Sequence, residues 1–233
     1  MREAVRAVLF DLDGTLLDSA PDLIHAANRL RASHGLGPVA PEAFRPQVSQ
    51  GGRAMLAVAF SHLDPAEREA LLPLFLDDYR QNIAVDSRLF DGFAEILNAL
   101  QAAGLALGII TNKVEWLTTP LLAQLGLDQV FGAVLCGDSL PERKPHPAPV
   151  LAACARLGVD PAQAVMVGDD RRDIEAGRAA GCRTLSAAYG YISAGENIHD
   201  WGADGVLASP WQLLDWLGIG HVAGSRESRD ERR

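Results

Sequence analysis

The stretch VRAVLFDLDGTLLDS, which runs from Val5 to Ser19, is the most informative part of this sequence. Its apolar run ends at two carboxylates one residue apart, Asp11 and Asp13, and a glycine and a threonine follow at once. A short continuous apolar run of this kind predicts a strand buried on both faces. Two like charges at the end of such a strand repel each other and cost stability. We therefore expect a cation or a reaction that needs both carboxylates.

Similar apolar runs alternate with helical patterns along most of the chain. They predict strands at residues 4–10, 105–110, 133–136, 164–167, 183–187 and 205–208. Helices are predicted between these strands, at 93–103, 119–125, 148–157 and 174–180. Pro120 suits the first turn of its helix, where a proline gives up no needed donor. This alternation predicts an α/β fold with a doubly wound parallel sheet.

One long segment, residues 19–88, lacks a convincing strand. Its apolar residues recur at three- and four-residue spacing and predict helices at 21–33, 41–47, 53–61 and 65–83. We expect an all-helical domain here, inserted into a sheet domain made of residues 1–18 and 89–220. Inserted after the first strand, it would lie above the carboxyl ends of the strands. Residues 221–233 mix both charge signs with almost no apolar content, which predicts a disordered tail.

The composition narrows the class of protein. The 233 residues suffice for one large α/β domain with a smaller module. The net charge of −9 argues against non-specific binding to nucleic acid or to an anionic membrane. No apolar run approaches the length of a membrane span, and the first run is too short for a signal peptide. The three cysteines form no CxxC pair, so we expect buried thiols in a reducing, cytoplasmic setting rather than a zinc site or disulfides.

Polar side chains follow four of the predicted strands. Because ligands bind outside the carboxyl ends of parallel strands, we expect these side chains to converge. The residues, in chain order, are Asp11, Asp13, Thr111, Asn112, Lys113, Lys144, Asp169, Asp170 and Asp173. One such match would be weak evidence for a site, but four in order, each at a strand end, are hard to obtain by chance.

The residue types indicate phosphoryl transfer. Several carboxylates without histidine or thiolate partners form a hard oxygen site that suits Mg²⁺ rather than zinc. Thr111 and Lys144 supply a hydroxyl and an ammonium, which are donors for phosphate oxygens. A carboxylate such as Asp11 can attack phosphorus and form an aspartyl-phosphate. Asp13 could protonate the leaving alkoxide and then accept a proton from the attacking water. Positioning and charge stabilisation are the main demands of this reaction.

Taken together, DLDGT (Asp11–Thr15), Thr111, Lys144 and GDDRRD (Gly168–Asp173) resemble the four motifs of the haloacid dehalogenase superfamily. The resemblance covers nearly the whole chain and implies a Rossmann-like core with a helical C1 cap. It also implies that Asp11 is the nucleophile and Asp13 the general acid–base. The implied Mg²⁺ ligands are the Asp11 carboxylate, the Asp13 backbone carbonyl and Asp169. Thr111 and Lys144 would bind the phosphoryl group, and Asn112 joins them as a substrate-binding candidate.

Four further residues have two interpretations each. Asp173 either orients Lys144 or a metal-bound water, or caps the following helix, and these roles are compatible. Asp170 is a metal ligand or a loop-stabilising residue. Lys113 is a surface lysine or lines the cleft. Arg53 follows two glycines in the insertion, where it either recognises a phosphate or carboxylate or forms a surface ion pair.

Within the superfamily the chain most resembles the phosphoglycolate phosphatase group. The stretches GGRAM (51–55), SRLFDG (87–92), TNK (111–113), YGYI (189–192) and WGAD (201–204) resemble those of phosphatases that act on N-acetylmuramic acid 6-phosphate, a sugar phosphate of peptidoglycan recycling, and this resemblance implies that substrate. The alternatives are 2-phosphoglycolate as substrate, or a sugar phosphomutase reaction with the same motifs. A haloacid dehalogenase is a weaker alternative, because cleavage of a carbon–halogen bond does not need a second aspartate such as Asp13. A receiver domain of a response regulator would carry its phosphorylated aspartate after a later strand, whereas Asp11 follows the first predicted strand. The oligomeric state stays open.

Overall fold

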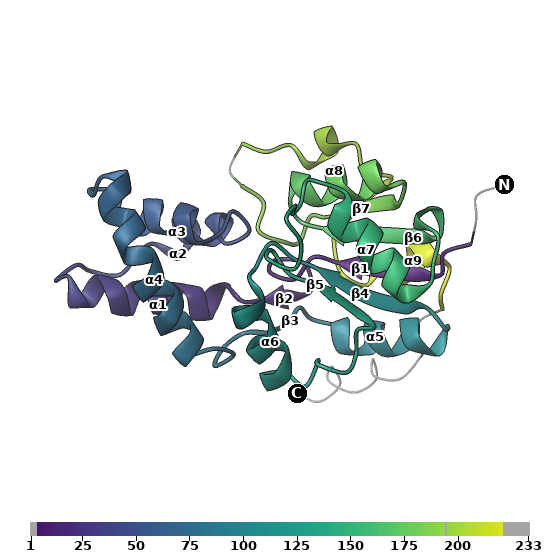
Figure 1. Cartoon of the computed structure of the whole chain (residues 1–233), viewed down its shortest axis with the longest axis horizontal. Coiled ribbons are helices and arrows are strands. Elements are labelled where there is room, and N and C mark those ends of the chain that lie inside the picture. Colours follow the sequence, from purple (N-terminus) through teal and green to yellow (C-terminus); the bar gives the residue numbers. More distant parts are fainter. Residues whose placement is uncertain (1–3, 194, 221–233) are drawn as a thin grey trace, which may run out of the picture.

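The computed structural model describes residues 4–193 and 195–220, and its central feature is a parallel sheet (Figure 1). Six strands of the described chain form it in the order β5-β4-β1-β6-β7-β8. They are β1 (Ala7–Phe10), β4 (Ala106–Ile110), β5 (Ala133–Leu135), β6 (Ala164–Gly168), β7 (Arg183–Ala187) and β8 (Gly205–Leu207). From β1 the chain builds one half of the sheet and then returns to build the other. The predicted doubly wound α/β sheet is confirmed, and β1 lies beside the reversal where such sheets bind ligands.

The central strand β1 explains why the apolar runs are continuous. Its four residues are fully buried and pair in parallel with β4 on one side and β6 on the other. Val8 and Phe10 pack into the core on one face of the sheet, whereas Ala7 and Leu9 pack into the core on the other. With helices over both faces, neither set of side chains meets water.

Helices cover both faces of the sheet (Figure 1). On one face lie α7 (Ala148–Leu157) and α8 (Arg171–Ala180), which share a core with Ala7 and Leu9. The other core is shared by α5 (Phe93–Ala102), α6 (Glu115–Gln124) and α9 (Gln212–Leu217). Short 3₁₀ helices complete this part, η2 (Pro161–Gln163) and η3 (Ile198–Trp201). None of the described helices combines the length and the apolar character that crossing a membrane requires.

Several predicted helix boundaries are wrong. Helix α6 begins at Glu115 rather than 119, so Pro120 lies inside it and not in its first turn. Leu117 is buried in this added turn, so its apolar contacts outweigh the hydrogen bond that the proline cannot donate. Helix α8 begins three residues before the predicted 174, because Asp170 caps it. Helix α9 was not predicted.

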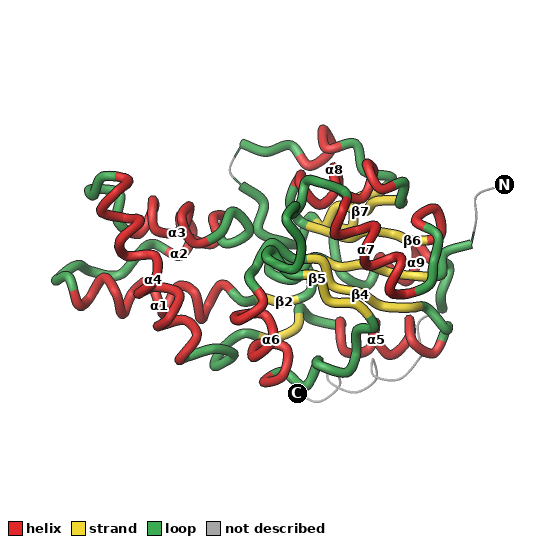
Figure 2. Tube along the Cα trace, viewed as in Figure 1, coloured by secondary structure: helices red, strands yellow, loops and turns green. Residues whose placement is uncertain are grey.

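The helices of the second region, which we call the helical insertion (residues 20–81), group on one side of the sheet (Figures 1 and 2). They lie within a few residues of their predicted positions: α1 (Ala20–Ser33), α2 (Pro41–Phe44), η1 (Arg45–Gln47), α3 (Gly52–Ala59) and α4 (Pro65–Gln81). Phe44, Phe60 and Phe75 are fully buried in a second core, to which Leu117 and Tyr191 from outside the insertion also contribute. That residues 19–88 act as a separate cap domain stays a prediction, and residues 221–233 lie outside the described part of the chain.

Two connections join the helical insertion to the sheet, and they are bonded to each other. The two-residue strands β2 (Leu17–Asp18) and β3 (Arg88–Leu89) pair antiparallel, a ribbon too short to be predicted from the sequence. Beside it, the buried Asp22 carboxylate accepts hydrogen bonds from the backbone N–H groups of Asp86 (2.9 Å) and Ser87 (3.0 Å). The Ser87 hydroxyl donates to the same carboxylate at 2.6 Å.

Candidate active site

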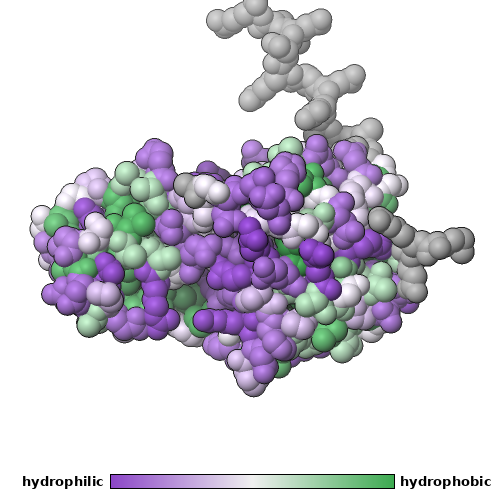
Figure 3. Space-filling model, turned by 90° about the horizontal axis from the view of Figure 1, so that it is seen from above, coloured by the Kyte–Doolittle hydropathy of each residue, from purple (hydrophilic) through white to green (hydrophobic). Residues whose placement is uncertain are grey.

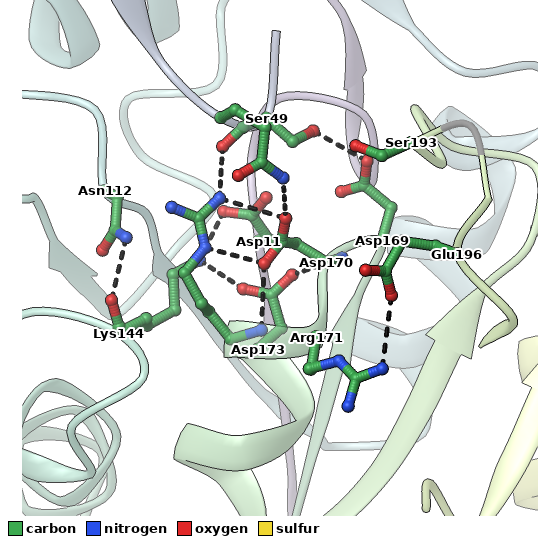
Figure 4. A network of polar contacts seen from close by, with 12 residues as sticks. Asp11, Ser49, Asn112, Lys144, Asp169, Asp170, Arg171, Asp173, Ser193 and Glu196 are labelled. Atoms are coloured by element: carbon green, nitrogen blue, oxygen red, sulfur yellow. Dashed lines mark hydrogen bonds and ion pairs between the residues drawn. The ribbon is translucent and has the colours of Figure 1, made fainter. Parts of the chain in front are cut away.

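The polar residues at the strand ends converge at one edge of the sheet (Figure 4). Asp11 follows β1, Lys144 lies in the loop between β5 and α7, and Asp173 lies in the first turn of α8. The Lys144 Nζ donates to Asp11 Oδ1 at 2.6 Å and lies 2.7 Å from Asp173 Oδ1. It also donates to the Ile110 carbonyl at 2.6 Å. All three charged side chains are buried, so the lysine holds two carboxylates together away from water.

The fourth strand-end residue, Asp169, is locked to the DLDGT loop. Its Oδ1 accepts a hydrogen bond from the Thr15 hydroxyl at 2.8 Å, and its Oδ2 accepts from the Tyr191 N–H at 2.9 Å. Gly14 has φ of 90°, and a side chain there would collide with the Asp169 carboxylate. No role was predicted for Thr15 or Tyr191, although Thr15 lies within the DLDGT motif.

Burial and repulsion set the charges of this cluster. Burial raises the pKa of Asp11, and it raises the pKa of Asp169 well above the ordinary range, with repulsion from Asp11 and Asp173 adding to the effect. Burial likewise raises the pKa of Asp173 to about 7, although the Lys144 ammonium opposes the shift. Burial alone would lower the pKa of Lys144, but its two carboxylate partners outweigh that cost and keep the pKa above its usual value.

The donor set fits a magnesium ion. One carboxylate oxygen each of Asp11, Asp169 and Asp173 lies within 4.8 Å of the others, and all three residues are buried. Lys144 is ion-paired with Asp11 and Asp173, but no salt bridge reaches Asp169 within residues 4–193 and 195–220. Three buried carboxylates against one ammonium leave excess negative charge, and hard oxygen donors are the ligands that Mg²⁺ prefers. The family resemblance implied the Asp13 backbone carbonyl as a ligand beside Asp11 and Asp169, which stays a prediction, and Asp173 is the third carboxylate of this trio.

Asp13 points its carboxylate toward a second lysine. The Lys113 Nζ donates to both Asp13 carboxylate oxygens, at 3.1 and 3.2 Å, and to the Tyr79 hydroxyl at 3.1 Å. The Ser19 hydroxyl also donates to Asp13. Because Tyr79 belongs to α4, Lys113 connects the sheet edge with the helical insertion. Of the two interpretations of Lys113, the structure therefore favours a residue that lines the cleft.

Asp170 and Asp173 together cap helix α8. The Asp170 carboxylate accepts from the Arg172 N–H at 2.9 Å, and Asp173 accepts from the Asp170 N–H at 3.0 Å. The Arg172 Nε also donates to Asp170 at 2.7 Å. Burial would raise the pKa of Asp170, but these bonds hold it below its usual value. Asp170 thus contacts an arginine and a helix end, and Asp173 both caps α8 and contacts Lys144.

The phosphoryl-binding candidates lie beside these carboxylates. Thr111 is buried, and its Oγ accepts a hydrogen bond from the Lys113 N–H at 3.1 Å, which leaves its own O–H available to a ligand. The Asn112 amide donates to the Lys144 carbonyl at 3.0 Å, while its buried Oδ1 has no partner in the described chain.

A cleft of about 320 Å³ lies between the sheet edge and the helical insertion. Asp11, Asp13, Thr111 and Lys144 line it from the sheet. The insertion contributes the apolar side chains of Leu23, Val48, Met55 and Leu76 and the ring of Tyr79, together with residues 49–53. Hydrophilic residues gather where the two regions meet on one face of the molecule (Figure 3). The cleft therefore combines a charged floor with a partly apolar wall.

Arg53 also lines this cleft, but its guanidinium is engaged. Its Nε and one terminal nitrogen donate to the two carboxylate oxygens of Glu69, at 2.8 and 2.7 Å, and the side chain is 72% exposed. The surface ion pair is thus present, and substrate binding by Arg53 stays a prediction.

One loop of the insertion touches the acidic cluster itself (Figure 4). The Ser49 hydroxyl donates to Asp169 Oδ2 at 2.9 Å, and the Ser49 carbonyl accepts from an Arg172 terminal nitrogen at 2.6 Å. The Gln50 amide donates to Asp170. The contacts of Arg172 were not predicted, because nothing in the GDDRRD motif distinguishes this arginine from a surface residue.

Comparisons with known proteins agree with this geometry. Residues 8–187 match the family of haloacid dehalogenase-like hydrolases. A phosphoglycolate phosphatase of Xanthomonas campestris pv. campestris is 50% identical over 90% of this chain and 95% of the relative. An N-acetylmuramic acid 6-phosphate phosphatase of Pseudomonas aeruginosa is 46% identical over 93% of this chain and 96% of the relative.

A solved structure supports the same family. The crystal structure of a predicted phosphoglycolate phosphatase from Haemophilus somnus is similar with a TM-score of 0.81 and 31% identity. The similarity extends over 91% of this chain and 97% of the Haemophilus chain. Sequence family, relatives and fold coincide, and the protein is therefore a phosphatase that belongs to the haloacid dehalogenase-like hydrolases.

Proposed function

We propose that this phosphatase is a Mg²⁺-dependent phosphomonoesterase that hydrolyses N-acetylmuramic acid 6-phosphate through an aspartyl-phosphate on Asp11. The observation that carries the proposal is the buried group of Asp11, Lys144, Asp169 and Asp173, of which Asp11, Lys144 and Asp173 line a cleft that also has apolar side chains in its wall. Asp11 and Asp169, with the Asp13 carbonyl or Asp173, would hold the ion. Bound there, Mg²⁺ would neutralise charge on the phosphoryl oxygens.

In the first step, an Asp11 oxygen attacks phosphorus and the bond from phosphorus to the ester oxygen breaks. Lys144 orients Asp11 through the 2.6 Å contact and offers positive charge to the phosphoryl group. The Thr111 hydroxyl donates to a phosphoryl oxygen. Asp13 gives its proton to the departing alkoxide, which leaves as the alcohol.

In the second step, Asp13 accepts a proton from water, and the resulting hydroxide attacks the phosphorus of the aspartyl-phosphate. The bond from phosphorus to Asp11 breaks, and inorganic phosphate and the free carboxylate result. The Lys113 ammonium at 3.1 Å from Asp13 holds that carboxylate in the cleft, where it faces both the alkoxide and the water.

The shape of the cleft favours a sugar phosphate over a two-carbon acid. A volume of about 320 Å³ lies at the lower end of what pockets for drug-sized ligands provide. The side chains of Leu23, Met55 and Leu76 offer apolar contact that a two-carbon acid cannot use. The 46% identity to the Pseudomonas enzyme is consistent with this choice.

A second candidate substrate is 2-phosphoglycolate. The Xanthomonas relative named for that activity is 50% identical, which favours it on sequence alone. Both substrates would use the same acidic cluster, so they differ only in their contacts with the insertion.

The two candidates separate in one experiment. Release of inorganic phosphate from each compound would be measured with Mg²⁺ and with EDTA. We expect kcat/KM for N-acetylmuramic acid 6-phosphate to exceed that for 2-phosphoglycolate, and EDTA to abolish both activities. The reverse order would assign 2-phosphoglycolate. An isomeric sugar phosphate without free phosphate would indicate a phosphomutase instead.

A further inference from the structure

The cations that line the cleft differ in whether they already have partners. Among the described residues they are Arg53, Lys113, Arg143, Lys144 and Arg172. Four of them are engaged by carboxylates, namely those of Glu69, Asp13, Asp11 with Asp173, and Asp170. The Arg143 guanidinium forms no hydrogen bond or ion pair within residues 4–193 and 195–220. It is therefore the cation of this cleft that a ligand can bind without breaking an existing pair.

The backbone of Arg143 is fixed although its side chain is exposed. The next residue is Lys144, whose ammonium is buried against Asp11 and whose carbonyl accepts from the Asn112 amide at 3.0 Å. The Arg143 carbonyl accepts from the His146 N–H at 2.9 Å. A guanidinium anchored beside the phosphoryl-binding lysine can reach a second group of the same substrate.

The charges of the cleft define what that second group is. Asp11, Asp13, Asp170 and Asp173 all line the cleft, so a further anion on the substrate would meet repulsion unless a free cation received it. A guanidinium carries one charge in a planar fork and matches one carboxylate with two parallel hydrogen bonds. A second phosphate dianion would bring more negative charge than one arginine offsets.

We propose that Arg143 is a specificity-determining residue that binds a carboxylate of the substrate, so that this enzyme selects phosphomonoesters that also carry a carboxylate. The inference rests on the proposed phosphomonoesterase function and adds the class of substrate. N-acetylmuramic acid 6-phosphate and 2-phosphoglycolate both belong to that class. Their counterparts without a carboxylate, N-acetylglucosamine 6-phosphate and 2-hydroxyethyl phosphate, keep the phosphomonoester.

The test compares these two matched pairs in the wild type, Arg143→Met and Arg143→Lys. The wild type should prefer the carboxylate member of whichever pair it hydrolyses. Arg143→Met should lower kcat/KM for that member by about 10- to 100-fold, because hydrogen bonds between charged groups contribute that much. The loss should lie mainly in KM, and kcat/KM for the member without a carboxylate should change by less than about twofold. Arg143→Lys should restore part of the preference.

Arg156→Met is the matched control, because it removes the same charge from an exposed arginine of α7 outside the cleft. It should leave the preference unchanged, and melting temperatures should show that all variants are folded. Equal losses for both members in Arg143→Met, or a wild type without preference, would overturn the assignment of Arg143. Failure of the wild type to hydrolyse any of the four compounds or p-nitrophenyl phosphate would instead overturn the proposed function, and the inference with it.

Discussion

The sheet edge and the helical insertion build opposite sides of the same cleft by different means. At the sheet edge, charged groups are buried and bonded to each other, as in the contact between Lys144 and Asp11. In the insertion, the ion pair of Arg53 and Glu69 is exposed at the rim of the cleft, and apolar side chains such as Leu23 and Met55 form part of the wall. Buried ionic groups are costly to separate, whereas exposed pairs contribute little. We therefore expect the chemistry to depend on the sheet edge and substrate choice on the surfaces around it.

The largest expected effect is at the sheet edge. Asp11→Asn should reduce phosphate release below detection, because an amide is no nucleophile toward phosphorus. Asp13→Asn should lower kcat by about 10² to 10⁴-fold, because it removes general acid–base catalysis. Steady-state assays of phosphate release, with circular dichroism to show an intact fold, measure both. Asp200→Asn, an exposed position, is the control. Turnover near that of the wild type in either variant would contradict the assigned roles.

The buried carboxylates that would hold the metal should lower folding stability at the same edge when no ion is bound. Asp169→Asn removes a buried charge, and the new amide can still accept from Ser49 and Tyr191 while donating to Thr15. Without Mg²⁺ we expect this variant to be more stable than the wild type by at least about 1 kcal/mol, because its side chain no longer needs to be charged or protonated at neutral pH.

With Mg²⁺ the order should change. The wild type should gain about 2.7 kcal/mol when Mg²⁺ reaches 100 times its dissociation constant, and Asp169→Asn should gain little. Thermal unfolding in EDTA and in a Mg²⁺ series measures both. A variant that Mg²⁺ stabilises as much as the wild type would remove Asp169 from the ligand set.

A smaller effect is expected where the two regions join. Asp22→Ala should lower the free energy of unfolding by about 2 kcal/mol, because three donors lose a buried charged acceptor. Asp77→Ala, which removes an exposed carboxylate of α4 from its bond with Gln81, should change it far less. Urea unfolding compares the two. Equal changes would mean that the junction contributes no more than the surface.

The pH dependence at Tyr79 tests whether the regions act together. Burial raises the pKa of Tyr79, which remains above its usual value despite the Lys113 ammonium nearby. As pH rises above about 10, the unfolded chain releases this proton while the folded protein retains it, so stability falls. In Tyr79→Phe the fall should be less steep, by a difference that grows with pH toward a limit of about 1.4 kcal/mol per pH unit. Urea unfolding between pH 9 and 11 measures the slopes, and identical slopes would show that Tyr79 is already exposed in solution.

The smallest effect is expected at Arg53. Because Glu69 holds its guanidinium at the surface, Arg53→Ala should leave the melting temperature within error. It should also raise KM for N-acetylmuramic acid 6-phosphate only slightly more than for p-nitrophenyl phosphate. Glu69→Gln, which frees the arginine, is the partner variant. A large, substrate-specific rise in KM for Arg53→Ala would place substrate choice in the insertion and away from Arg143.

The contrast also explains what the sequence could predict. Buried strands and the polar residues after them follow from topology alone, so the approach of Asp11, Lys144 and Asp173 could be predicted without coordinates. The partners of exposed side chains could not, because Arg53 reaches Glu69 only through the packing of α3 on α4. For Lys113, the position at a strand end could be predicted, but its burial could not, because that depends on the position of Tyr79 in the insertion.

The helix that contains Pro120 shows a different limit. A proline is favourable in a first turn, but buried Leu117 extends α6 toward its N-terminus and overrides the local preference. The two-residue ribbon of β2 and β3 was missed for a similar reason, because so short a pairing has no periodicity to detect.

Tyr191 links two parts of the molecule that a catalytic cycle would need to coordinate. Its N–H holds Asp169, while its hydroxyl donates to Asp18 at 2.7 Å and accepts from the Ala20 N–H at 3.0 Å, at the start of the insertion. A swing of the insertion that breaks the hydroxyl contacts would also disturb the backbone that supports the Asp169 carboxylate. Opening of the cleft and a change in the position of the Asp169 carboxylate would then occur together.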